Sequence, residues 1–194
     1  MITIVGPREW KKYPEAINTT SSASGWSRGL SPFILGPVTL YNGMVAKRFE
    51  NLWQFAKLYT EHVNHNGEVT QKYWDWAKAG WNSEKAIRYP MGKGKIPLCS
   101  LWEGERLGYI EARKKIYIPF YRDLVKKTDA FFQLQERYRR QGDITLFDFD
   151  GYDYRNLELS LGQVLVNSKR KMGHAFVLAM MLEYGVDFKI ENLK

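Results

Sequence analysis

A carboxylate, an amide and an amine recur at short spacing within residues 49–57, the segment Phe-Glu-Asn-Leu-Trp-Gln-Phe-Ala-Lys. Glu50, Gln54 and Lys57 lie four and then three positions apart, which places them on one face if the segment is helical. Glu50 and Lys57 are then about 10 Å apart along the helix axis, too far for a direct ion pair. A ligand lying between them could contact both. The alternative is an ordinary solvated helix face.

A second group of carboxylates, Asp148, Asp150 and Asp153, follows an apolar strand-like segment. The sequence Asp-Phe-Asp-Gly is similar to the haloacid-dehalogenase phosphatase signature, in which Asp148 would be the nucleophile and Asp150 the acid/base. Tyr152 replaces the usual Thr or Val, and the short remaining tail leaves no room for the doubly wound domain that such a phosphatase requires. Gly151 is also misplaced for an EF-hand loop. A Mg²⁺-dependent phosphatase is therefore the least favoured alternative.

The chain is basic, with 29 Lys and Arg against 21 Asp and Glu and a net charge of +8. This balance favours a polyanionic partner, such as a nucleic acid, a nucleotide or a phosphorylated metabolite, although it is also compatible with plain surface charge. The Gly-Lys-Gly-Lys segment at residues 92–95 lacks the spacing of a P-loop. The basic residues that could contact phosphates are Arg88, Lys93, Lys95, Arg106, Arg113, Lys114, Lys115, Lys169, Arg170 and Lys171.

The remaining composition narrows the class of protein. Cys99 is the single cysteine, so no internal disulfide forms and a reducing cytoplasm is expected. No apolar run approaches the roughly 20 residues of a membrane span. The three histidines show no spacing of a zinc site, and no cofactor is expected. The twelve Tyr and seven Trp suit either an aromatic core or stacking on bases. The oligomeric state is not indicated.

The periodicity predicts an α+β domain, predominantly helical, around a small and mostly antiparallel sheet. Residues 1–27 are expected to form an N-terminal strand and polar loop extension, and residues 28–194 the main domain. Strands are expected at residues 2–5, 32–38, 39–41, 45–49 and 143–149, with a hairpin turn at Asn42-Gly43. Helices are expected at residues 50–63, 69–79, 83–87, 107–117, 120–141 and 173–184, and residues 157–166 form a further apolar-periodic segment.

Four sequence blocks occur in a recognisable order. They are Ser31-Pro32-Phe33 with Asn42-Gly43; residues 50–57; residues 93–98 with Trp102 and the basic helix to Tyr117; and Leu146-Phe147-Asp148 with Asp153, Gly173 and Met180-Met181. Together they resemble the NADAR, or YbiA-like, family over residues 28–184. Asn51 replaces the family's usual His, no Trp-Gly follows Asp153, and His174 stands where Asn is expected. The chain is thus similar to a divergent member.

This resemblance implies an enzyme that cleaves N-glycosidic bonds to ribose, such as those in ribosylamino-pyrimidines or ADP-ribosylated guanine. It implies catalytic roles for Glu50 and Lys57, with Asp153 orienting the ribose or the amine. The residues implied in substrate binding are Trp53, Gln54, Trp102 or Tyr109 against the base, Asp148, and the phosphate-binding Lys95, Arg106 and Arg113. The expected partner is an ADP-ribosyl or phosphorylated ribosyl molecule, free or on modified nucleic acid. The competing expectation is a protein that binds nucleotides or nucleic acid without catalysis.

Overall fold

The strands of the computed structural model, which describes residues 1–193, form three small sheets. In the first, β8 (Ile144–Phe147) lies between β1 (Ile2–Val5) and β2 (Ile17–Asn18), and both pairings are parallel. The second is the antiparallel hairpin of β3 (Val38–Thr39) and β4 (Val45–Ala46). The third is antiparallel and contains β5 (Lys57–Leu58), β6 (Cys99–Trp102) and β7 (Glu105–Leu107).

Helices make up about 41% of the molecule and strands about 13%, which defines a mixed α+β single domain. The α-helices are α1 (Phe49–Phe55), α2 (Gln71–Trp81), α3 (Tyr109–Ala112), α4 (Ile118–Val125), α5 (Asp129–Gln141), α6 (Leu161–Val166) and α7 (His174–Tyr184). A π-helical segment, Arg113–Tyr117, joins α3 to α4. Short 3-10 turns occupy Trp10–Lys12, Trp26–Leu30, Thr60–His62 and Ile190–Asn192.

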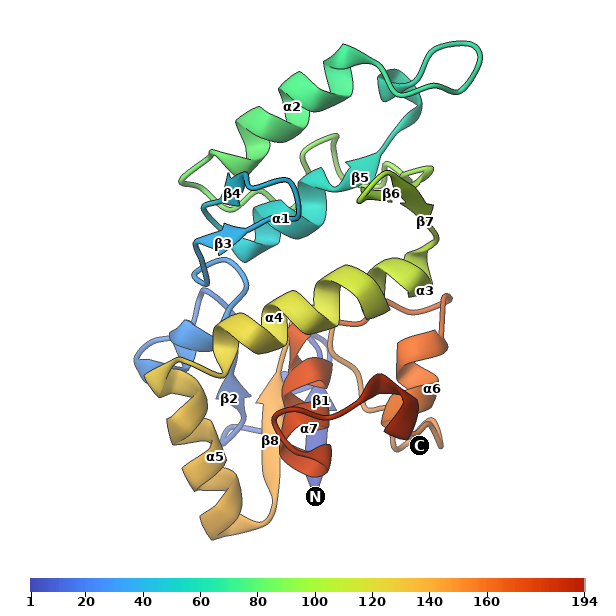
Figure 1. Cartoon of the computed structure of the whole chain (residues 1–194). Coiled ribbons are helices and arrows are strands. Elements are labelled where there is room, and N and C mark those ends of the chain that lie inside the picture. Colours follow the sequence, from blue (N-terminus) through green and yellow to red (C-terminus); the bar gives the residue numbers. More distant parts are fainter. Residues whose placement is uncertain (194) are drawn as a thin grey trace.

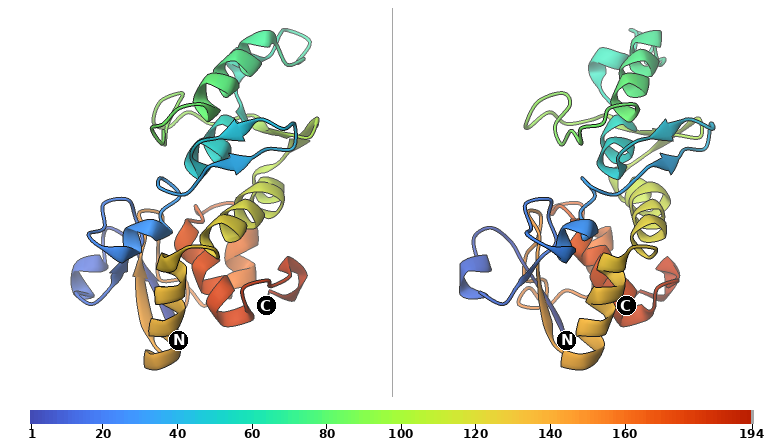
Figure 2. Two further views of the ribbon diagram at one scale, coloured as in Figure 1. Left: turned by 60° about the vertical axis from the view of Figure 1, so that its left-hand side comes forward. Right: turned by 90° about the vertical axis from the view of Figure 1, so that its left-hand side faces the viewer.

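The elements gather toward two ends of the molecule (Figure 1). The continuous helical segment over residues 109–125, made of α3, the π-helical segment and α4 and called the rod below, runs between them. The α1 and α2 helices and strands β3 to β7 lie at one end, and the parallel sheet with α5, α6 and α7 lies at the other. The two further views keep this division (Figure 2). Helix α7 is buried along His174–Met181, so the core of the second end surrounds it.

Several expectations from the sequence are confirmed. The first strand, the hairpin around Asn42-Gly43, the strand after Gly142 and the last helix all form. Gly142 ends α5 with φ of 73°, a conformation that favours glycine. Residues 1–27 supply β1 and β2, whose Ile2, Ile4 and Ile17 side chains are buried in the common core.

Other expected boundaries are wrong. The helix expected over residues 50–63 ends at Phe55, because the chain then pairs with β6 through Lys57 and Leu58. Of residues 32–38 only Val38 is in a strand, and residues 83–87 form no helix. The helix expected over residues 120–141 is broken after Val125, and the Thr128 side chain accepts a hydrogen bond from Phe131 N–H to begin α5. Pro119 lies in the first turn of α4, directly after the π-helical segment Arg113–Tyr117, so its missing N–H falls within the continuous rod.

Within residues 1–193, every helix is too short or too polar to cross a lipid bilayer. The parallel arrangement around β8 and the sheet of β5, β6 and β7 were not anticipated, whereas the β3–β4 hairpin is antiparallel as expected. The parallel sheet matters for the site because the chain leaves β8 directly into Asp148, beside the start of α7.

Candidate functional site

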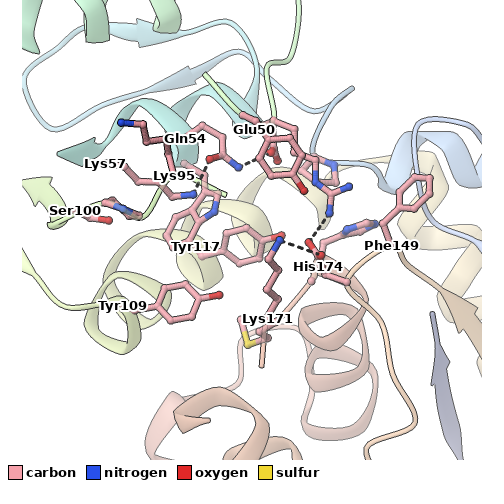
Figure 3. A pocket seen from close by; sticks show the side chains of 18 of the residues that line it. Glu50, Gln54, Lys57, Lys95, Ser100, Tyr109, Tyr117, Phe149, Lys171 and His174 are labelled. Atoms are coloured by element: carbon pink, nitrogen blue, oxygen red, sulfur yellow. Dashed lines mark hydrogen bonds and ion pairs between the residues drawn. The ribbon is translucent and has the colours of Figure 1, made fainter. Parts of the chain in front are cut away.

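A cavity of about 720 Å³ lies between the two ends of the molecule. This volume is within the roughly 300–1,000 Å³ typical of small-molecule sites. Its walls come from α1 and β5, the loop at residues 88–98, the rod from α3 to α4, the segment after β8, and residues 168–174. Figure 3 shows side chains from these separate elements converging on the same space.

Glu50, Gln54 and Lys57 form a hydrogen-bonded chain along one wall of the cavity (Figure 3). The Gln54 amide nitrogen donates to Glu50 Oε1 at 2.8 Å, and Lys57 Nζ donates to Gln54 Oε1 at 2.6 Å. Glu50 and Gln54 are one turn apart on α1, while Lys57 reaches the same side from β5. Gln54 therefore separates the acid from the amine, and the predicted convergence is confirmed although its third member lies outside the helix.

Burial shifts the pKa values of Glu50 and Lys57 in the directions that favour their uncharged forms. The pKa of Glu50 is raised by burial, against the opposing effects of the Gln54 hydrogen bond and the Lys57 charge. The pKa of Lys57 is lowered by burial to about 8, although Glu50 opposes the shift. The amine is thus partly neutral near physiological pH, and the carboxyl group is easier to protonate than an exposed glutamate.

A second acid–base pair, Asp148 and His174, closes the inner end of the cavity. His174 Nδ1 lies 3.1 Å from Asp148 Oδ2, and His174 Nε2 lies 2.8 Å from the carbonyl oxygen of Thr19. Both ring nitrogens face acceptors, so the arrangement suits an imidazolium that donates from each. A Cβ on Gly173 would lie 2.1 Å from the Asp148 carboxylate, so only glycine fits beside the pair.

The pKa values of this pair move in the direction of a charged couple. Burial alone would raise the pKa of Asp148, but the His174 charge and the N–H groups of Ala175 and Asp150 lower it to about 2. Burial alone would lower the pKa of His174, but the Asp148 charge and the hydrogen bonds raise it. Both Asp148 oxygens are already occupied by these contacts.

Aromatic side chains line the wall opposite α1. The Tyr117 ring packs edge-on against Trp53 at a centroid distance of 5.0 Å, and Tyr109 lies 6.5 Å from Trp53. Burial, followed by the charges of Asp148 and Glu50, raises the pKa of Tyr117 well above its usual value. Its hydroxyl therefore stays protonated and can donate to a ligand. Lys57 Nζ lies 5.0 Å from the Trp53 ring, a cation–π contact.

Positive side chains flank the mouth of the cavity. Arg88 Nη2 pairs with Asp150 at 2.8 Å, and Lys171 Nζ lies 3.9 Å from the same carboxylate. The Arg88 guanidinium also contacts the rings of Tyr89 and Phe149. Asp150 thus joins two cations that come from separate loops, residues 88–98 and residues 168–174.

Most of the site residues expected from the sequence do line the cavity. They are Glu50, Trp53, Gln54, Lys57, Lys95, Tyr109 and Asp148. Lys95 is paired with Glu61 at 2.7 Å. Of the two candidate base-stacking residues, Tyr109 faces the cavity, whereas Trp102 is buried in β6 against Tyr41 and Phe120.

Three further expectations are wrong in their placement. Asp153 lies outside the cavity, because its oxygens cap their own turn by accepting from the backbone of Arg155 and from Asn156. Arg106 lies on β7 and donates to the carbonyl of Gly67. Arg113 is buried behind the wall, and its guanidinium is hydrogen-bonded to backbone carbonyls.

The structure adds functional candidates that sequence reasoning did not assign to the site. They are Ser100, Tyr117, Phe149 and His174. Arg88 and Lys171, expected as possible phosphate contacts, and Asp150, expected only in the phosphatase alternative, also line the cavity. The basic run at residues 169–171 was a visible signal, but nothing local indicated that it meets Arg88. Likewise, the His174–Asp148 contact joins residues that are 26 positions apart.

Comparisons with protein-family models, with curated proteins and with solved structures found no significant match to this chain. The resemblance to the NADAR family therefore rests on the four sequence blocks alone.

Proposed function

We propose that this protein is an N-glycosidase that hydrolyses an N-glycosidic bond to ribose, in an ADP-ribosylated base or nucleotide or a related phosphorylated N-riboside. The observation that carries the proposal is the Glu50–Gln54–Lys57 chain inside a ligand-sized cavity. The four-block resemblance to the NADAR family supports the same reaction class. Glu50 and Lys57 are proposed as catalytic residues, and Gln54 as the group that fixes their orientation.

Cleavage of an N-glycosidic bond needs a proton for the leaving nitrogen and stabilisation of positive charge at C1′. In the proposed reaction, protonated Glu50 gives its proton to the leaving nitrogen as the C1′–N bond breaks. The neutral Lys57 amine forms a bond to C1′. A water molecule then carries one proton from the Lys57 nitrogen to the Glu50 carboxylate, and O4′ takes the other as the ring opens to a Schiff base. Water adds to C1′, releases the ribose and restores the amine.

The rest of the cavity suits a substrate with an aromatic and an anionic part. Tyr109 offers an exposed ring face beside the amine. Arg88 and Lys171 supply positive charge at the mouth, where phosphate oxygens could replace Asp150 as their partner. The Tyr117 hydroxyl is proposed to donate to a ribose oxygen.

A binding protein without catalysis is the second candidate, favoured by the mouth itself. There the Arg88 guanidinium contacts Tyr89 and Phe149, a combination that also holds nucleotides without chemistry. A phosphatase centred on Asp148 is less well supported, because both oxygens of that carboxylate accept hydrogen bonds from the protein.

The test is release of base or nucleotide from ADP-ribosylated guanine nucleotides and from ADP-ribosylated DNA, followed by chromatography and mass spectrometry. Borohydride added during turnover is expected to reduce the Schiff base and leave a sugar-derived mass on Lys57. Lys57→Ala should lower turnover by at least about 10³-fold, and Glu50→Gln by about 10²–10⁴-fold.

Lys115→Ala and Glu105→Gln are matched controls, because this exposed ion pair lies away from the cavity. Both controls should retain wild-type turnover. Turnover at the wild-type rate by folded Lys57→Ala protein would sink the assigned chemistry. Salt-dependent binding of ADP-ribose or DNA with no product from any substrate would favour the binding candidate.

A further inference from the structure

Arg113 is a fully buried cation that does not reach the cavity. Its Nη1 donates to the carbonyl oxygens of Val164, Leu165 and Asn167 at 3.3, 2.9 and 2.9 Å. Its Nη2 donates to the carbonyl oxygen of Arg170 at 2.5 Å. Within residues 1–193 no carboxylate forms an ion pair with it. Each hydrogen-bond acceptor of this guanidinium given above is thus a backbone oxygen.

These four acceptors belong to the end of α6 and the loop that follows. Val164 and Leu165 lie in the last turn of the helix, where carbonyl groups have no partner within the helix and a cation is favourable. Asn167 and Arg170 lie in the loop that carries Lys169, Arg170 and Lys171 to the cavity. A single side chain therefore ties this loop to the rod between α3 and α4.

The same guanidinium also supports a second part of the wall. Its Cζ lies 4.2 Å from the centre of the Tyr109 ring, which is 41% exposed and lines the cavity. The Tyr109 and Lys171 side chains enter the cavity from different elements (Figure 3). Arg113 contacts the Tyr109 ring and the Arg170 carbonyl but does not itself line the cavity.

We propose that Arg113 is a positioning residue, which fixes the loop at residues 167–171 and the Tyr109 ring in the places that ligand binding requires. A guanidinium suits this task because its planar fork points several N–H groups at once. A lysine could keep the charge but could not span the carbonyls of Leu165 and Arg170 together. The consequence for catalysis rests on the proposed function, whereas the consequence for the loop does not.

The loop provides its own probe, because Lys169, Arg170 and Lys171 are trypsin sites. The experiment compares Arg113→Lys and Arg113→Met with the wild type in brief digestion of native protein, with cut sites assigned by mass spectrometry. Cleavage within residues 169–171 should accelerate by at least about tenfold in Arg113→Met, because the loss of several charged hydrogen bonds raises the open population. Arg113→Lys should fall between Arg113→Met and the wild type.

Arg122→Met is the matched control. Arg122 also lies along the rod and donates to a backbone carbonyl, that of Phe188 at 3.0 Å, but it does not line the cavity. Its loss should leave cleavage at residues 169–171 unchanged. A second readout is the KM of ADP-ribosylated substrate, which should rise in Arg113→Lys with kcat little changed and stay normal in Arg122→Met.

Wild-type cleavage rates in folded Arg113→Lys and Arg113→Met proteins would overturn the proposal, as would equal acceleration in Arg122→Met. If Arg113→Met does not fold by circular dichroism, Arg113→Lys decides by the same cleavage and KM measurements. Faster loop cleavage in the Arg113 variants, together with no turnover of any substrate by the wild type, would contradict the proposed function and leave the positioning role standing. Normal wild-type turnover, together with wild-type loop cleavage in the Arg113 variants, would contradict the positioning role and leave the proposed function standing.

Discussion

Two buried acid–base groups face the same cavity, but they differ in how completely they are satisfied. Asp148 and His174 contact each other, and their remaining polar atoms contact Thr19, Ala175 and Asp150. Glu50 and Lys57 do not contact each other and share only the Gln54 amide. The first group is closed within the protein, whereas the second leaves donor and acceptor capacity for a ligand.

The pKa shifts follow this difference. In the Asp148–His174 pair burial is the largest single effect, but the partner charge and the hydrogen bonds together outweigh it, so the charged forms are favoured. In the Glu50–Lys57 group burial outweighs the partner charge, so both pKa values shift in the direction of the neutral forms. Burial of a carboxylate alone therefore does not identify a reactive group. The informative feature is a charge that the fold leaves incompletely paired.

The largest expected difference between the two groups is in stability, when an amide of the same shape replaces the carboxylate in each. Asp148→Asn should lower the free energy of unfolding by about 3 kcal/mol, because it leaves the His174 charge buried without its partner. Glu50→Gln should leave the free energy of unfolding unchanged or raise it, because burial already disfavours the charged form of that carboxyl group. Urea unfolding of both variants at pH 7 measures the difference.

A loss of stability in Glu50→Gln that equals the loss in Asp148→Asn would remove the contrast between the two groups. The double variant Asp148→Asn with His174→Gln checks the cause. It should recover part of the loss, because the unpartnered cation is then absent.

The sequence predicted the Glu50–Gln54–Lys57 group better than the Asp148–His174 pair. The reason is that the first group is close together in the sequence and the second is not. Glu50 and Gln54 are one helical turn apart, so local spacing predicts their contact. Lys57 reached the predicted side even though the helix ended at Phe55. By contrast, the Asp148–His174 pair depends on how α7 packs beside β8, which no local pattern specifies.

The same limit explains the misplaced residues. Asp153 was assigned through the family resemblance, and Arg113 through the resemblance and its charge. Neither signal reveals whether backbone groups nearby will occupy the side chain. The first strand, the hairpin, the strand after Gly142 and the last helix were predictable because periodicity and turn residues are local signals. The parallel pairing of β1 and β2 with β8 joins segments more than 120 residues apart and was not.

A smaller effect is expected in the pH dependence of stability. The pKa of Asp148 falls from 3.8 to about 2 on folding, so its contribution is present above pH 3.8 and is lost as the pH falls toward 2. That loss amounts to about 2 kcal/mol. The pKa of His174 is raised above 6.5, so its contribution is present below pH 6.5 and is lost as the pH rises through the folded value.

The difference in unfolding free energy between wild type and Asp148→Asn should therefore be largest between about pH 4 and pH 6.5. Urea titrations across pH 3 to 9 measure it. A difference that is constant over this range would show that the pair does not titrate as the geometry requires.

The third expected effect lies in the pH dependence of catalysis. With the pKa of Lys57 at about 8, the neutral amine fraction should rise about tenfold between pH 7 and pH 9, and so should the rate at which free ribose forms a borohydride-trapped Schiff base with Lys57. The value of kcat does not follow this rise, because bond cleavage also needs protonated Glu50, whose fraction falls as the pH rises. The Lys171 charge contributes to lowering this pKa, so Lys171→Met should move the rise to higher pH. A profile that is flat over this range, or one that Lys171→Met moves to lower pH, contradicts the role assigned to the amine.

The smallest effect on stability is expected at the mouth, where Arg88 and Asp150 form a pair whose side chains are 28% and 29% exposed. Asp150→Asn should change the free energy of unfolding by less than about 1 kcal/mol. It should nevertheless strengthen the binding of ADP, because Arg88 and Lys171 lose their shared carboxylate and the mouth becomes more positive. Calorimetric titration of ADP at low and high salt measures this, and the gain should shrink as salt screens the freed charges. If ADP instead binds more weakly to Asp150→Asn, then Asp150 itself contacts the ligand, and the mouth belongs with the open group rather than with the closed one.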